Sequence, residues 1–360
     1  MFKVAIDPHW RISRTMGTKP GVPLDTDLLL RLLAAIQSSG SIAAAVKASG
    51  LSYRHVWGLL MEAEQLFNAK LLIKQPGKGT RLSPLAETLL WADKRISARL
   101  SPTLQSLASE LEAELDKTVL GARAALRIDA THGFAVAALL DQLTAANVPV
   151  ELRYRNSTEA VAALARRECD LAGFHVPLGE FEAEAVKRYA KWLNAEQHVL
   201  IHLAVRTQGF FVAAGNPKNI RSLEDLTRPD VRFVNRQPGS GTRLLLELML
   251  DEKGISTSSI RGWESAEFTH AAVAAYIASD MADVGVGVET AAKRFGLDFV
   301  PLIRERYFFA ADKQAIEKSP LNEIVAILQG PDFRQQLSEL AGYDGSKTGL
   351  IMEVREAFPS

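Results

Sequence analysis

Apolar positions at the start of the chain recur at spacings of three and four, which predicts helices. The first helix can be capped by Asp25 or Thr26 and should stop near Gly40. Its apolar stripe consists of Leu28, Leu29, Leu32, Leu33 and Ile36. Two more are predicted over Ile42–Ala48 and Tyr53–Phe67, and each is preceded by a serine that can cap it. The last two helices are joined by a turn at Gly50, so this segment predicts a helix-turn-helix.

The segments Leu71–Lys74 and Thr80–Ser83 then predict a small hairpin, which would be the basic wing of a winged helix-turn-helix. A long helix should begin at Pro84, and Pro102 can kink or restart it. Its stripe predicts either a dimerisation seam or packing on its own domain. The stripe consists of Leu85, Leu89, Ala92, Ile96, Leu100, Leu104, Leu107, Leu111 and Leu115.

Beyond residue 124, short apolar strands alternate with helices, which predicts a parallel α/β sheet. Tyr307–Ala311 is a late strand that can return to the first part of this sheet. Two α/β lobes joined by crossing strands predict a module that closes on a ligand. The other expected strands are Leu126–Ala130, Val150–Arg155, Asp170–Val176, Val199–Val205, Phe210–Ala214, Val231–Asn235 and Asp283–Val288. The expected helices are 133–145, Ser157–Arg167, Thr242–Glu252 and Thr269–Ser279.

The patterns predict four parts. They are an irregular lead-in (1–23), a winged helix-turn-helix (24–83), a linker or dimerisation helix (84–120) and a two-lobed ligand-binding domain (121–350). Lobe 1 is expected over about 124–205 and 307–350, and lobe 2 over about 210–303.

Charge is divided unevenly along the 360 residues. Residues 1–100 hold 14 Lys and Arg against 7 Asp and Glu, whereas the remainder holds 28 against 35. A basic first part indicates contact with a polyanion. No apolar run reaches the roughly 18 residues of a membrane span, and no secretory leader is evident, so we expect a cytoplasmic protein without membrane contact. A single cysteine, Cys169, excludes an internal disulfide.

The second helix of a helix-turn-helix presents side chains to base edges in the major groove. Here it would present Ser52, Tyr53, Arg54 and His55, while Trp57 and Leu60, three apart, are expected to face the core. In the wing, Lys78 and Arg81 suit phosphate contacts. Double-stranded DNA is therefore the predicted partner.

A second candidate site lies at residues 235–243, where a strand is followed by Gly239, Ser240, Gly241 and Thr242 at the start of a helix. Backbone amides at a helix N-terminus bind anions, and the two hydroxyls add donors. Ligands of open α/β sheets bind beyond the carboxyl ends of strands. Further donors are expected there: Thr131, His132, Ser157, His175, Arg236, Thr269 and His270.

Other chemistries fit the sequence poorly. The three histidines lack the short spacing of a metal site, so no metal is expected. Ser240 lacks a Gly-x-Ser-x-Gly elbow, and residues 77–80 lack the upstream glycine of a phosphate loop. These residues indicate binding of an anion without turnover, hence a protein that is not an enzyme.

Residues 24–90 resemble the DNA-binding domain of ModE-type molybdenum regulators and, more distantly, of LysR-type regulators. The resemblance is carried by Leu32–Ile36, Gly40–Ile42, Gly50–Trp57 and 77–84. It implies a homodimer or dimer of dimers on a pseudo-palindromic operator.

Residues 124–350 resemble cytoplasmic molybdate-binding-protein-like domains, which have the two-lobed fold of type II periplasmic binding proteins. The matching pieces are Gly173–His175, Gly209, Asn216–Pro217, Asn235–Arg243, Thr269–His270, Asp283–Gly287, Leu297–Leu302, Glu305–Tyr307 and Gly342–Asp344. The chain departs from the family at Thr131–Gly133, where Ser-His-Asp is more usual, and at Phe174, where a smaller aliphatic residue is usual.

The resemblance implies molybdate or tungstate as the effector, with no other cofactor, and control of molybdenum-related or formate-dehydrogenase-type genes. Formate or another small carboxylate is the alternative effector. A second alternative is a molybdenum-cofactor handling or storage module that uses its helix-turn-helix for protein contacts.

Overall fold

The structure, a computed structural model, describes residues 2–16, 19–20, 23–75, 79–120 and 125–358. The chain forms two compact units, one of residues 7–100 and one of residues 1–6 and 101–360. In the described part of the chain, no helix is long and apolar enough to cross a membrane.

The unit of residues 7–100 is a winged helix-turn-helix. Its helices are α1 (Thr26–Ser39), α2 (Ile42–Ser49) and α3 (Tyr53–Phe67), and β5 (Leu72–Gln75) pairs with β6 (Gly79–Leu82) as the wing. The side chain of Ser52 caps α3 by accepting a hydrogen bond from the amide of His55. The buried faces of the helices meet in one core that includes Leu29, Leu33, Ile36, Val56 and Leu60.

The segment before α1 is more regular than we expected from its glycines and prolines. It contains two short antiparallel pairs, β1 (Arg11–Ile12) with β4 (Leu24–Asp25), and β2 (Thr15–Met16) with β3 (Lys19–Pro20). The sequence left open whether Pro102 breaks the long helix, and in the structure α4 runs through it over Pro84–Leu120.

The other unit is built on one mixed sheet, in the order β12-β11-β13-β10-β14-β9-β7-β8. Its first lobe contains β7 (Leu126–Ala130), β8 (Val150–Tyr154), β9 (Leu171–Pro177), β15 (Tyr343–Asp344) and β16 (Ile351–Glu353). The helices of this lobe are α5 (Phe134–Ala145), α6 (Ser157–Ala165), α7 (Glu182–Lys187), α11 (Leu321–Gln329), α12 (Pro331–Ser338) and α13 (Val354–Ala357). They cover both faces of the sheet with separate apolar cores.

The second lobe contains β11 (Phe233–Arg236), β12 (Ala266–Glu267) and β13 (Val284–Val288). Its helices are α8 (Gly241–Glu252), α9 (His270–Ala278) and α10 (Glu289–Arg294). They too cover two faces, each with its own core. The predicted fold class, an α/β two-lobed domain preceded by a winged helix-turn-helix, is confirmed.

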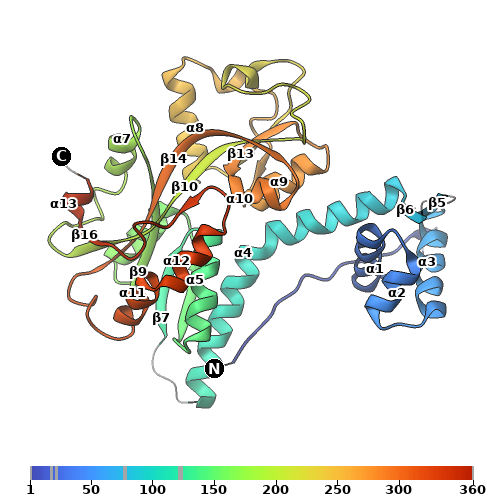
Figure 1. Cartoon of the computed structure of the whole chain (residues 1–360), viewed down its shortest axis with the longest axis horizontal. Helices are drawn as coiled ribbons and strands as arrows, with labels where there is room; N and C mark the ends of the chain where they lie inside the picture. Colours follow the sequence, from blue (N-terminus) through green and yellow to red (C-terminus); the bar gives the residue numbers. More distant parts are fainter. Residues whose placement is uncertain (1, 17–18, 21–22, 76–78, 121–124, 359–360) are drawn as a thin grey trace. The chain divides into compact units, whose positions relative to one another are not determined.

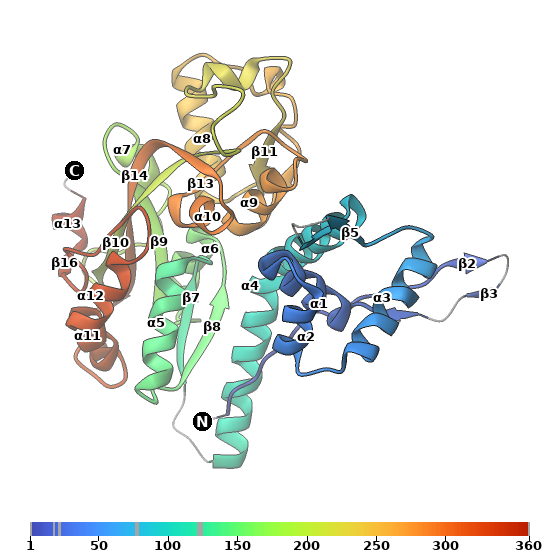
Figure 2. The same cartoon turned by 45° about the vertical axis from the view of Figure 1, so that its right-hand side comes forward.

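Two long strands connect the lobes, as Figures 1 and 2 show. They are β10 (His198–Val212) and β14 (Asp298–Asp312), antiparallel to each other over their whole length. The sequence predicted β10 as two shorter strands and only the end of β14. The register of the pair shifts between Gln208 and Gly209, which lies in the region where the lobes meet.

The later part of α4 lies along the edge strand β8 (Figure 2). Ser109 Oγ accepts a hydrogen bond from the amide of Leu152 at 2.8 Å, and Ser106 Oγ accepts one from the amide of Tyr154 at 2.9 Å. The helix thus occupies amides that an edge strand would otherwise expose.

Candidate functional site

The two connecting strands bring a buried group of charged and polar side chains to the boundary between the lobes. Arg206 of β10 donates from Nε to Glu305 Oε1 of β14 at 2.5 Å, and Gln208 Nε2 donates to Glu305 Oε2 at 2.7 Å. All three side chains are almost completely buried. Burial lowers the pKa of Arg206, but Glu305 outweighs this effect and raises it, so Arg206 stays charged.

Arg236, at the end of β11, is the second arginine of this boundary, and its side chain is only partly buried. Its Nη2 donates to the carbonyl oxygen of Phe268 at 2.8 Å. Its Nε and Nη1 are buried and have no hydrogen-bond partner among the described residues. Burial and the nearby charge of Arg206 lower the pKa of Arg236 to about 9. Arg236 is therefore a cation at neutral pH, which the nearby carboxylates of Glu305 and Glu267 favour, and two of its three guanidinium nitrogens have no hydrogen-bond partner among the described residues.

Two histidines complete this group. His175 of β9 stacks on Tyr307 of β14, with ring centroids 4.0 Å apart, and lies near Thr131 Oγ1 at 3.4 Å. His270 begins α9 and lies close to Gly287, where an added Cβ would meet Nδ1 at 2.8 Å. His175 Nε2 and His270 Nδ1 are buried without hydrogen-bond partners in the described structure. Burial, followed by the charges of Arg206 and Arg236, holds both pKa values well below the usual range, so both rings are neutral.

His132 lies next to the group formed by Arg206, Glu305, Arg236, His175 and His270. Its ring meets that of Tyr154 edge-on, with centroids 4.9 Å apart. Burial, and then the charge of Arg236, lowers the pKa of His132 to about 4.

The hydroxyl residues predicted for the site occupy the starts of helices. Ser240 Oγ accepts from the amide of Arg243 at 3.3 Å, and Thr269 Oγ1 accepts from that of Ala272 at 2.9 Å. Ser157 Oγ accepts from the amide of His175 at 3.3 Å. A hydroxyl that accepts in a cap keeps its own hydrogen, so Ser240 can still donate to a ligand.

A narrow hollow of about 30 Å³ is lined by residues from both lobes, including His175, Glu305 and Gly241. Thr242, next to Gly241, is buried. A larger hollow of about 350 Å³ lies between the N-terminal segment, α4 and α5, but it contains none of the predicted ligand residues. The unpaired donors, and not the size of a hollow, therefore mark the boundary between the lobes as the candidate site.

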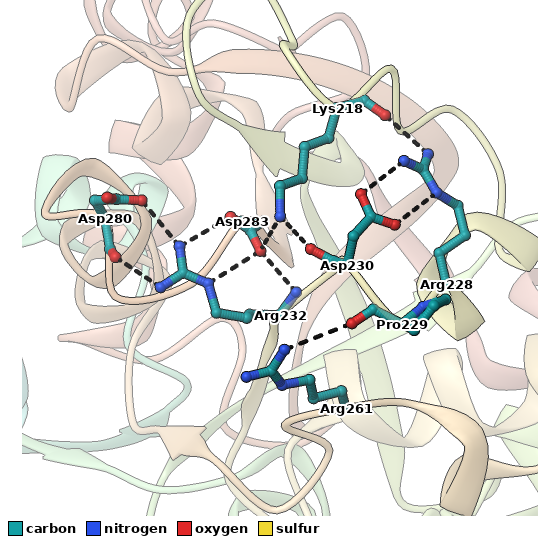
Figure 3. Close-up of polar contacts among 8 residues, drawn as sticks. All are labelled: Lys218, Arg228, Pro229, Asp230, Arg232, Arg261, Asp280 and Asp283. Atoms are coloured by element: carbon teal, nitrogen blue, oxygen red, sulfur yellow. Dashed lines mark hydrogen bonds and ion pairs between the residues drawn. The ribbon is translucent and has the colours of Figure 1, made fainter.

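Another arginine cluster, in lobe 2, differs from the group around Arg236 because its cations have anionic partners (Figure 3). There Arg232 donates to Asp280 and Asp283, and Lys218 also donates to Asp283. Although burial raises it, hydrogen bonds from Arg232 and Lys218 hold the pKa of Asp283 at about 2. Because its cations already have anionic partners, this cluster is a structural ion-pair network.

The candidate DNA-binding residues lie together at the start of α3. Tyr53, Arg54 and His55 are exposed, Ser52 caps the helix, and Arg81 is exposed on the wing strand β6. Lys78 lies outside the described residues. Leu60 faces the core as expected, but the expectation for Trp57 is wrong, because its side chain is 39% exposed. Trp57 lies on the face of Tyr53 and not on that of Val56 and Leu60.

Sequence reasoning missed Arg206, Gln208 and Glu305. Charged and amide side chains inside otherwise apolar strands were the available signal, since such groups are seldom buried without a partner. The geometry adds Arg206, Gln208 and Glu305 to the candidate site residues. The candidates proposed from the sequence were Thr131, His132, Ser157, His175, Arg236, Ser240, Gly241, Thr242, Thr269 and His270. Within the described ranges, no three His, Cys, Asp or Glu side chains are placed to hold a metal ion.

Two α/β lobes joined by crossing strands, with unpaired donors between them, define a ligand-binding protein of the two-lobed class. A family model described as a PBP superfamily domain matches residues 140–329, and the chain belongs to this superfamily.

Several curated proteins are similar in sequence. Uncharacterized protein YvgK of Bacillus subtilis is 34% identical over 203 residues, which are 56% of this chain and 64% of YvgK. An uncharacterized protein in a ferredoxin gene 5′ region of Clostridium pasteurianum is 34% identical over 29% of this chain and 97% of its own length. The HTH-type transcriptional regulator CbbR of Cereibacter sphaeroides is 25% identical over 62% of this chain and 67% of its own length.

Solved structures with some likeness include CbnR, a LysR family transcriptional regulator. It is 17% identical, covers 82% of this chain and 97% of its own, and has a TM-score of 0.38. Corynebacterium glutamicum OxyR, as a C206 mutant, is 14% identical over 86% of this chain and 93% of its own, with a TM-score of 0.41.

Proposed function

We propose that this chain is a DNA-binding transcription regulator whose two-lobed domain binds a small anion. The helix-turn-helix with its exposed Arg54 and Arg81 supports the DNA-binding half. The similarity to the regulator CbbR supports the same assignment. As a sensor, the protein would bind its effector without converting it, and it would act in the cytoplasm.

The main support for an anion as the ligand comes from Arg236, whose Nε and Nη1 have no hydrogen-bond partner among the described residues. Buried donor atoms without a partner are costly, and an anion that accepts from Nε and Nη1 would remove that cost. His175 Nε2 and His270 Nδ1 can donate to the same ligand when the other ring nitrogen is deprotonated. Ser240, Thr242, Thr131, Ser157 and Thr269 would add hydroxyl donors, His132 a further ring donor, and Gly241 a backbone amide.

Molybdate or tungstate is our first candidate effector, because a tetrahedral oxyanion can accept from many neutral and charged donors at once. Formate or another small carboxylate is the second, since a carboxylate matches the Nε and Nη edge of Arg236. The controlled genes would then be of the molybdenum-related or formate-dehydrogenase type. A molybdenum-cofactor handling module is the remaining alternative for the whole chain.

Isothermal titration of chelator-treated protein with molybdate, tungstate, sulfate and formate tests the anion site. We expect saturable binding of at least one of these anions, lost in Arg236→Ala and retained in Arg261→Ala. Arg261 is a matched control, because it is exposed and its guanidinium contacts only the carbonyl of Pro229 among the contacts drawn in Figure 3. Tight binding of molybdate or tungstate alone selects the first effector, and binding of formate alone selects the second. Equal binding to wild type and Arg236→Ala would contradict the proposed site.

Binding to a mixed pool of duplexes at several salt concentrations tests the DNA-binding half. Phosphate contacts make duplex affinity fall steeply with salt. An Arg54→Ala, Arg81→Ala double variant should bind more weakly and with a shallower salt dependence. Absence of any salt-sensitive duplex binding by the wild-type protein would favour the cofactor-handling alternative.

A further inference from the structure

The outer face of α3 carries a stripe of large exposed side chains. Tyr53, Trp57 and Met61, spaced by four residues, are 55%, 39% and 37% exposed. A neighbouring face of the helix supplies Val56 and Leu60 to the core of its unit. The stripe therefore contributes little to the core, and a contiguous exposed apolar surface of this kind marks an interaction site.

The two aromatic side chains are arranged as a stacked pair. The rings of Tyr53 and Trp57 are nearly parallel, with 8° between their planes and 6.2 Å between their centroids. Lys74, from wing strand β5, places its Nζ 5.8 Å from the centre of the Trp57 ring. Helix and wing thus form one continuous face in which a cation and an aromatic plane lie side by side.

The charges around this pair indicate the partner. Arg54 and Lys74 are exposed next to it, and Arg81 is exposed opposite Ile73 in the hairpin register. Residues 7–100 hold 13 Lys and Arg against 7 Asp and Glu. A basic surface with a central apolar stripe fits duplex DNA, which presents phosphates at the rim of the major groove and thymine C5-methyl groups within it. A second protein copy would need acidic or apolar complementarity instead.

We propose that Trp57, held by its stacking on Tyr53, determines sequence preference by contacting thymine methyl groups in the major groove. The proposal rests on the proposed DNA-binding function, and it assigns to α3 an apolar reading element beyond the polar contacts of Arg54 and His55. A buried methyl group is worth about a fourfold change in affinity, so the effect is measurable.

The test removes the methyl groups themselves. The full chain first selects preferred duplexes from a library of randomised sequence. One selected duplex is then synthesised with uracil replacing thymine at one position at a time, which deletes only the C5-methyl group. We expect at least one position at which uracil weakens wild-type binding about fourfold. At that position, Trp57→Ala should bind the thymine and uracil duplexes equally, whereas Trp57→Phe should keep part of the difference.

Trp91→Ala is the matched control, because Trp91 belongs to α4 and is covered by Lys94 at 4.5 Å. It should retain the full thymine preference. The proposal is overturned if Trp57→Ala retains that preference, if no position in the wild-type complex distinguishes the two bases, or if the variant changes self-association in sedimentation while duplex preference stays the same. Failure of all duplex binding would instead overturn the DNA-binding function itself, and the salt titration detects that case separately.

Discussion

At the scale of residues, the boundary between the lobes holds two arginines that differ in how many of their guanidinium nitrogens have a hydrogen-bond partner. Arg206 is paired with Glu305, whereas Arg236 keeps two buried donor atoms free. A buried charge without a partner is tolerated when the site gains from binding its counter-ion. The contrast between the two arginines is therefore the physical basis for assigning an anion to Arg236.

The lowered pKa of Arg236 predicts a pH dependence of anion binding. The pKa is about 9 without ligand, and a bound anion would raise it by stabilising the charged form. Affinity should therefore be undiminished below about pH 9 and should fall as pH rises through that value, with proton uptake on binding near pH 9. Titrations in buffers of different ionisation enthalpy measure the uptake. An affinity that is constant between pH 7 and pH 10 would contradict this prediction.

Replacement of Glu305 tests how much its carboxylate stabilises the buried charge of Arg206. Glu305→Gln leaves the buried Arg206 without its carboxylate, so the free energy of unfolding should fall by about 3–5 kcal/mol. An added anion should recover part of this loss and raise the melting temperature more than it does in the wild type. Glu247→Gln, which removes the half-exposed partner of Arg243, is the control and should cost below about 1 kcal/mol. Equal losses in the two variants would show that the Arg206–Glu305 pair is not buried as described.

Local signals in the sequence located some of these residues better than others. Ser240 and Thr269 follow strands and precede helices, so capping and strand-end rules were enough to propose them. Arg206, Gln208 and Glu305 meet only when β10 and β14 pair, and no local pattern contains that pairing. Trp57 was assigned to the core because it lies three residues from Leu60, whereas in the structure it stacks on Tyr53, one helical turn before it on the same helix.

At the scale of elements, the attachment of α4 to the edge of the sheet depends on two serines. Ser106 and Ser109 lie one turn apart and accept from the amides of Tyr154 and Leu152. β8 also ends next to the candidate site at the boundary between the lobes, where the ring of Tyr154 meets that of His132. The same short strand thus contacts both the candidate site and the helix that continues toward residue 84.

A Ser106→Ala, Ser109→Ala double variant should leave both strand amides without these acceptors. Unsatisfied buried amides cost about 1–3 kcal/mol each, so urea unfolding should show a clear loss of stability. Hydrogen exchange should be faster at Leu152 and Tyr154. Ser338→Ala, on the exposed side of α12, is the control, since Ser338 Oγ only donates to the carbonyl of Gln335 in its own helix. Unchanged exchange at the two strand amides would contradict the described contact.

Elements with strong local signals were predicted closely. The predicted range of α3, Tyr53–Phe67, equals the observed one, because Ser52 caps its start and Asn68 adopts a left-handed conformation at its end. β10 was predicted as two strands because Arg206–Gly209 interrupts the apolar run, and Arg206 and Gln208 within it turned out to be buried between the lobes. The sequence alone did not decide whether Pro102 interrupts α4, and the helix continues through it.

At the scale of the whole molecule, the exposed apolar positions of α4 support the proposed dimer. Leu107 and Leu111, one turn apart, are 48% and 41% exposed in the structure of the single chain. Burial against the same helix of a second copy would remove these side chains from water. This face suits the homodimer, or dimer of dimers, that we propose as the DNA-binding species.

A Leu107→Glu, Leu111→Glu double variant should shift the protein toward monomer in analytical ultracentrifugation, because charges would have to be buried in the seam. Duplex affinity should fall with it, since each protomer would then bind alone. Glu110→Gln, on the same helix, is the control and should leave the association state unchanged. A variant that sediments as the wild type does would show that α4 is not the seam.

The measurement that tests the account most directly is the affinity of the full chain for a selected duplex, by fluorescence anisotropy, with and without the anion identified by calorimetry. We predict that saturating anion changes wild-type affinity at least about fivefold, as coupled sites typically do, and leaves the affinity of Arg236→Ala unchanged. If duplex affinity is the same with and without an anion that calorimetry shows to be bound, the protein is not a regulator controlled through this cleft.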